Sequence, residues 1–202
     1  MESLYDVKVE GIGKVKGGIY KNINLEGISN ILDNVEANDI HAEGTLKVNG
    51  SISCENISCE GMGKFKGNVE VRNHISFEGI MQVLGNIQAK TILVEGVMNS
   101  NGLINADAVS MEISRSCNLN EIGGSSIKIS SNSFHKRFWI NRKVKISCKI
   151  IEGDNIYLDN VNCDVVRGKN ITIGKGCNIA NIECSGNLDI NKESKVINIV
   201  RV

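Results

Sequence analysis

The sequence lacks proline, and only 4% of its 202 residues are aromatic. So few aromatic rings argue against a core built from large side chains and favour narrow layers of isoleucine and valine. The absence of proline, together with 21 glycines, is typical of strand-rich structure in which glycine makes the turns. Hydrophobic residues still make up 41% of the chain, which is enough to bury a core and argues against disorder.

No charge of one sign predominates, because 23 Lys and Arg residues balance 23 Asp and Glu residues. We therefore expect no general attraction to nucleic acid or to an anionic membrane. No apolar run approaches the roughly 18 residues of a membrane-spanning helix. The first residues, MESLYDVKVEG, have neither the basic nor the apolar region of a signal peptide. These absences predict a location in the cytoplasm, either free or at a membrane surface.

The residues of common catalytic and metal sites are present without the spacing that such sites need. Seven cysteines include no CxxC pair, so we expect reduced, buried thiols rather than a metal centre. The three histidines are scattered, and none forms a triad with a nucleophile and an acid. The stretch EGMGKFKGNVEV at 60–71 resembles a phosphate loop, but it fits neither GxGxxG nor GxxxxGK followed by Ser or Thr. We expect no enzyme activity, no catalytic or metal-binding residue and no cofactor.

That glycine-rich stretch belongs to an internal repeat. Residues 10–17 read EGIGKVKG, and six Glu-Gly pairs beginning at Glu10, 26, 43, 60, 78 and 95 divide the chain at intervals of 16 to 18 residues. Further positions repeat with them, and four columns consist mainly of apolar residues. These columns are Val15, Ile31, Val48, Phe65, Val83, Ser100; Ile19, Val35, Ile52, Val69, Ile87, Ile104; Ile23, Ile40, Ile57, Ile75, Ile92, Val109; and Leu25, Ala42, Cys59, Phe77, Val94, Met111.

Apolar and polar residues alternate within each unit, as in Asn-Val-Glu-Val at 68–71, and no unit contains a helical pattern. The sequence therefore predicts an all-β fold, a parallel β-helix (β-solenoid) whose coils have about 17 residues and lie ~4.8 Å apart. Gly61 and Gly67 should mark corners. Lys64 and Lys66 should face water, while Phe65 points inward.

The pattern weakens after Met111 and returns at residues 155–158, 170–173 and 187–190. We expect one domain over 1–202, with coils at about 10–113 and 146–202 and an insertion near 131–145. The insertion, SNSFHKRFWINRKVK, holds three of the eight aromatic residues and five Lys or Arg residues. Either it binds another protein or a membrane surface, or its rings pack onto the solenoid. The contact residues would be Phe134, Lys136, Arg137, Phe138, Trp139 and Arg142.

The repeat resembles that of the bactofilins, the polymer-forming cytoskeletal proteins of bacteria. The unit at 78–94 matches best, and IEGDNIYLDNVNCDVVRGKNITIGKGC at 151–177 is similar to the bactofilin-like proteins of Gram-positive bacteria. The resemblance implies a right-handed parallel β-helix that stacks end to end into filaments without nucleotide and scaffolds other proteins. This chain departs from the family in having no proline-rich tails and in its basic-aromatic insertion.

A solenoid also exposes unpaired backbone groups and open core at its ends unless polar caps cover them. The final strand, KVINIVRV, has little charge and resembles no cap. Strict alternation would place Val196, Asn198 and Val200 on one face and Ile197, Ile199 and Arg201 on the other. We therefore expect the chain to bind itself, as a polymer or a smaller oligomer, through Ile197, Ile199 and Val200.

Other classes of function remain open. Hexapeptide-repeat acyltransferases are β-helical enzymes, but their six-residue spacing occurs here only once, between Ile173 and Ile179. A secreted polysaccharide lyase would need export and a cluster of catalytic acids or bases. A monomeric binding module acting through 131–145 is the remaining alternative.

Overall fold

The computed structural model describes residues 4–131 and 144–202. This part of the chain contains strands and no helix, and therefore no helix that could cross a membrane. The strands are β1 (Val7–Val15), β2 (Gly18–Ile19), β3 (Asn22–Ile31), β4 (Val35–Val48), β5 (Ile52–Phe65), β6 (Val69–Val83), β7 (Ile87–Ser100), β8 (Leu103–Ile113), β9 (Cys117–Asn118), β10 (Glu121–Ser131), β11 (Ile146–Leu158), β12 (Val161–Ile173), β13 (Asn178–Cys184), β14 (Leu188–Ile190) and β15 (Lys195–Arg201).

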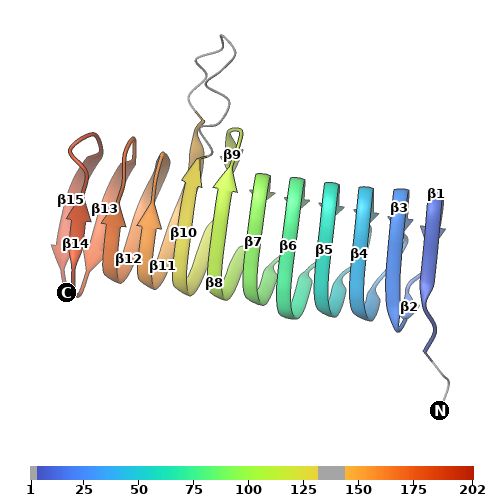
Figure 1. The fold of residues 1–202 in the computed structure, drawn as a ribbon. Helices are drawn as coiled ribbons and strands as arrows, with labels where there is room; N and C mark the ends of the chain where they lie inside the picture. Colours follow the sequence, from blue (N-terminus) through green and yellow to red (C-terminus); the bar gives the residue numbers. More distant parts are fainter. Residues whose placement is uncertain (1–3, 132–143) are drawn as a thin grey trace, which may run out of the picture.

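The strands form a parallel β-solenoid of about 11 coils (Figure 1). Each long strand pairs in parallel with the strand of the next coil, in the order β1-β3-β4-β5-β6-β7-β8-β10-β11-β12-β13-β15. The expected all-β fold with coils of about 17 residues is confirmed. The long strands bend, so one coil has three sides. In the second coil these are 23–25, 29–31 and 35–37, and we call the corresponding segments of every coil the first, second and third sides.

The core is a set of stacked columns, as the repeat predicts. Val69 of β6 pairs with Ile87 of β7, which pairs with Ile104 of β8, and all three side chains are buried. Glu70 and Gln88, their neighbours in sequence, are exposed. One face of each short strand is therefore buried along the length of the solenoid, and the hydrophobic effect of these columns holds the coils together.

The glycines of 60–71 have structural roles. Gly61 lies at the corner between the first and second sides with a φ of +120°, which L side chains rarely adopt. A Cβ on Gly63 would lie 2.7 Å from the ring of Phe65 and 2.8 Å from that of Phe77, so this glycine makes room for two buried rings. At Gly67, a Cβ would lie 2.6 Å from the backbone of Gly50.

Ile19 does not join the column assigned to it from the sequence. Gly18 pairs with Val35, which leaves Ile19 opposite Glu36 and exposed. Tyr20 is buried instead, and its hydroxyl donates a hydrogen bond of 2.9 Å to the Lys16 carbonyl oxygen. A one-residue shift of register exchanges the inward and outward sets of a strand.

The solenoid is also continuous where the sequence pattern fades. β10 pairs with β8 on one side and with β11 on the other, so residues between the two predicted blocks complete a coil. Its core residues Ile122, Ile127 and Ile129 are buried. The Glu-Gly pair that marks earlier coils is absent here, which is why the repeat appeared to be interrupted.

Candidate assembly surfaces

The N-terminal end of the solenoid leaves one edge of a strand unpaired within the described chain. β1 lies at the end of the strand order and pairs only with β3. Val7 and Val9 are half-buried, whereas Ile23 and Leu25, which pair with them in the second coil, are fully buried. The core columns of the first side therefore reach the surface here.

The C-terminal end has the same property. Within the described part of the chain, β15 pairs only with β13, and β14 only with β12. Leu188, Ile190 and Val196 are half-buried, and Ile199 is 47% exposed although Ile182, its partner in the coil below, is completely buried. The last coil thus ends the core columns of all three sides with apolar side chains in contact with water.

The three residues predicted for self-association have different positions on this last coil. Ile199 continues an inward column, whereas Val200 pairs with the half-buried Glu183 and lies in an outward column. Ile197 is 69% exposed. The expected alternation along β15 is wrong, because Val196 and Ile199 both lie above buried residues, Ile179 and Ile182. The strand turns a corner between them, and this turn changes the phase of the alternation.

The C-terminal end is partly covered by one polar side chain. The Arg201 guanidinium donates a hydrogen bond to the carbonyl oxygen of Gly186 and another, of 3.7 Å, to the Cys184 sulfur. This contact covers the corner where the third side ends. Four apolar side chains remain uncovered at this end, namely Leu188, Ile190, Val196 and Ile199. Alternation along the sequence did not distinguish them from the outward residues.

An open groove of about 720 Å³ lies on the third side of the C-terminal coils. Its floor includes Gly124, Gly153 and Gly168, which pair with one another in successive coils. Arg167 lies in this groove, with its Nε 2.8 Å from a carboxylate oxygen of Glu183 and its Nη1 3.7 Å from one of Glu152. Two carboxylates therefore already neutralise the guanidinium.

All seven cysteines are buried and none forms a disulfide. Desolvation by burial raises the pKa of both Cys54 and Cys59 to about 12, and that of Cys117 to about 11. These thiols stay protonated near neutral pH, and a protonated thiol is a poor nucleophile and a poor metal ligand. In the ranges 4–131 and 144–202, no three His, Cys, Asp or Glu side chains are grouped closely enough to hold a metal ion.

The six predicted contact residues of the basic-aromatic insertion, from Phe134 to Arg142, lie outside the described residues. Ser131 is the last residue of β10, and Ile146 the first of β11. The insertion thus connects the first and second sides of a single coil, at the same corner where Gly61 turns the chain in an earlier coil.

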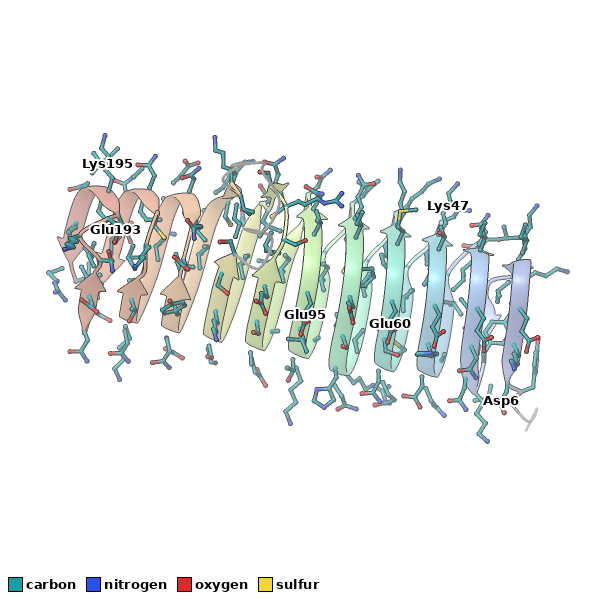
Figure 2. The ribbon with its side chains drawn as sticks, turned by 45° about the horizontal axis from the view of Figure 1, so that its top comes forward. Asp6, Lys47, Glu60, Glu95, Glu193 and Lys195 are labelled. Carbon is teal, nitrogen blue, oxygen red and sulfur yellow. The ribbon has the colours of Figure 1, made fainter. Side chains whose placement is uncertain are left out.

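The glutamates of the repeat form a column on the outside of the solenoid. Glu10, Glu26, Glu43, Glu60, Glu78, Glu95 and Glu112 pair successively from β1 to β8. A second outward column contains Lys14, Asn30, Lys47, Lys64, Gln82 and Asn99. Figure 2 shows Glu60 and Glu95 in a row along the solenoid and Lys47 nearer its margin. The outer surface therefore carries a column of negatively charged residues and, parallel to it, a column of lysines and uncharged polar residues.

Comparison with known proteins identifies one relative. The chain is 33% identical over 96 residues to the uncharacterized protein YhbF of Bacillus subtilis (strain 168). The match covers 47% of this chain and spans 40% of that protein's length. No family profile matches the sequence. No solved structure matches it either.

Proposed function

We propose that this protein is a non-enzymatic structural scaffold of the bactofilin type, which assembles end to end in the cytoplasm without nucleotide. The observation that carries the proposal is the exposure of core columns at both terminal coils. A second molecule stacked on the end would extend the parallel ladder and remove Ile199, Val196 and Ile190 from water. Burial of apolar surface and pairing of free strand edges both favour this contact.

The repeat supports the same proposal. The Glu-Gly units resemble those of polymer-forming bactofilins, and the β-solenoid is a fold that can be extended indefinitely by stacking. The Lys and Gly residues of 60–71, the nearest approach to a phosphate loop, serve as outward cations, corners and a space for aromatic rings. No nucleotide is needed to form a contact between two uncovered solenoid ends.

The test compares two charged substitutions on β15. Ile199→Glu places a carboxylate at the end of the core and should reduce sedimentation to that of a monomer while the circular dichroism spectrum stays unchanged. Ile197→Glu is the matched control, because it makes the same change on a more exposed side chain outside the core columns and should have a smaller effect. Monomeric sedimentation of the unaltered protein at high concentration would contradict the proposal.

Electron microscopy and titration calorimetry check the role of nucleotide. Filaments or stacked oligomers should form in nucleotide-free buffer, and ATP, GTP and NAD should give no heat of binding. Micromolar affinity for any of the three, or assembly only in its presence, would contradict nucleotide-independent assembly.

The proposal assigns contact with other proteins or a membrane surface to segment 131–145, on the basis of its composition alone. Replacement of residues 132–143 by a short Gly-Ser turn should preserve end-to-end assembly and abolish such contacts. Loss of assembly in this variant would show instead that the segment belongs to the polymer interface.

A further inference from the structure

The second side of the N-terminal coils carries a column of outward apolar side chains. Ile12 pairs with Ile28, which pairs with Thr45, and the column continues through Met62 and Ile80. The exposed fractions are 83% for Ile12, 54% for Ile28, 51% for Met62 and 39% for Ile80. The column ends in the next coil at Val97, which is buried. We call residues 12, 28, 45, 62 and 80 the apolar stripe.

The other two sides of the same coils carry no such stripe. The outward column of the first side consists of Lys8, Asn24, His41, Ser58 and Ser76. From the second coil on, that of the third side consists of Glu36, Ser53, Glu70 and Gln88. Thr45 in the middle of the apolar stripe is half-buried, and the other four members are exposed apolar residues. Single exposed apolar residues are normal on a protein surface, whereas several gathered in one patch mark a binding surface.

Charge distinguishes the two margins of the stripe. The glutamate column precedes it by two residues in every coil, as Glu60 precedes Met62. The lysine-containing column follows it by two residues, as Lys64 follows Met62. A surface with this arrangement is complementary to itself in one orientation only.

We propose that the apolar stripe binds the same stripe of a second copy of this chain, with the two solenoids side by side and parallel. A two-fold axis along the solenoid places the glutamate column of each copy opposite the lysine column of the other. A two-fold axis across the solenoid makes the copies antiparallel and places glutamates opposite glutamates. Opposite charges attract and like charges facing each other are unfavourable, so the charge pattern selects the parallel pair.

The glutamate column is complete from the first coil to Glu112, whereas the lysine-containing column has a lysine only in some coils, at Lys14, Lys47 and Lys64. Each lysine therefore faces a glutamate even if the copies slide by a whole coil. The stripe spans five coils, or about 20 Å, and buries on the order of a few hundred Å² per copy, less than the ~800 Å² of a standard stable interface. A single pair is thus weak, and molecules joined end to end would multiply the contact.

The first test measures pairing in a chain that carries Ile199→Glu, so that the proposed end-to-end contact does not contribute. At high protein concentration, its average mass in sedimentation equilibrium should rise toward that of a dimer. The double substitution Ile28→Asn and Met62→Asn should abolish this rise. The matched control, Ile19→Asn and Leu93→Asn, changes two apolar residues of similar exposure on the other two sides and should leave it intact. The proposal would be overturned if the mass stays that of a monomer, or if both double variants lose the rise in mass equally.

The second test determines orientation. Oxidative cross-linking of Ile12→Cys should give a disulfide-linked dimer, because parallel pairing brings the two first coils together, whereas Ile19→Cys should not. Added salt should weaken the parallel pair by screening its attractions. Association that strengthens with salt, or no cross-link at position 12, would contradict the parallel arrangement. Binding of the monomer to anionic lipid vesicles through Met62, without self-association, would identify a lipid surface as the occupant instead.

Discussion

A Cβ atom added to Gly79 would lie 2.1 Å from the carbonyl oxygen of Gly61 in the preceding coil. Gly79 also has a φ of +126°, so both its own conformation and the neighbouring backbone require glycine. Backbone atoms cannot move aside as the end of a flexible side chain can. At the Glu-Gly pairs from the second coil to Gly96, a side chain on the glycine would thus collide with the backbone of the preceding coil.

Substitution of Gly79 should destabilise the fold more than substitution of a glycine that no neighbouring coil approaches. We expect Gly79→Ala to lower the free energy of unfolding by about 2–4 kcal/mol, the combined effect of a disfavoured φ and a backbone clash. Gly11→Ala is the control, because Gly11 has a positive φ but no atom within 4 Å of an added Cβ, and should cost about 1–2 kcal/mol. Urea unfolding midpoints check the difference, and equal shifts would show that contact between coils is unimportant.

Substitution within a core column should be severe. Val69 is completely buried between the strands of neighbouring coils. Val69→Asp loses ~1.5–3 kcal/mol of apolar burial and adds a carboxylate that must stay unpaired in the core. Glu70→Ala, on the outward side, should leave the circular dichroism melting curve nearly unchanged. A native-like melting temperature for Val69→Asp would be incompatible with the stacked core.

Stability should fall at alkaline pH. Burial raises the pKa of Cys54 and Cys59 to about 12, above the ordinary thiol value of 9.0. Below about pH 9, these thiols are protonated in both states and their contribution to stability is complete. As the pH rises from about 9 toward 12, the unfolded chain ionises them more readily than the folded one, so the contribution is progressively lost.

The pH dependence can be assigned by replacing both thiols. Val71 pairs with Cys54, and Val94 lies in the column of Cys59. Valine therefore already occurs in both core columns and should fit at both positions. The variant Cys54→Val and Cys59→Val should lose less stability between pH 8 and 10.5 than the unaltered protein, as measured by urea unfolding. Identical slopes in the two proteins would show that other groups dominate the alkaline transition.

Polar side chains at the corner between the second and third sides link successive coils. The Asn86 backbone N–H donates to Asn68 Oδ1, and the Leu103 backbone N–H donates to Asn86 Oδ1, each over 3.0 Å. Asn86→Ala should cost about 0.5–1.5 kcal/mol because it leaves the Leu103 N–H without this acceptor. Asn86→Asp retains an acceptor and should cost less. Thermal unfolding distinguishes the two variants, and an equal loss would exclude the hydrogen bond as the cause.

The repeat was sufficient to predict the coils and most of their core. Residues that recur every 16 to 18 positions, such as Val69, Ile87 and Ile104, can lie in one buried column only if the coils stack in register. The inward position of Phe65 and the outward position of Lys64 followed from alternation within a strand. These features depend on local pattern, which a single sequence contains.

Other features depended on where the chain turns corners. Alternation alone did not show that Val196 and Ile199 both lie in inward columns, because a bend between them changes its phase. The repeat also misplaced Ile19 in a core column, since Gly18 rather than Ile19 pairs with Val35 and Tyr20 is buried instead. The coil containing β10 was missed because its corner has no Glu-Gly pair.

The sequence by itself thus determined the solenoid, its period and the residues of its columns, because burial at a fixed repeat admits few other folds. Only the tertiary structure decided which apolar residues remain in contact with water. Ile199 is exposed because, among the described residues, β15 pairs with a strand on one side only, and Met62 because its corner directs it outward onto the second side. The same residue type is core or surface according to the corner that precedes it and the presence of a neighbouring coil, and both are properties of the folded chain.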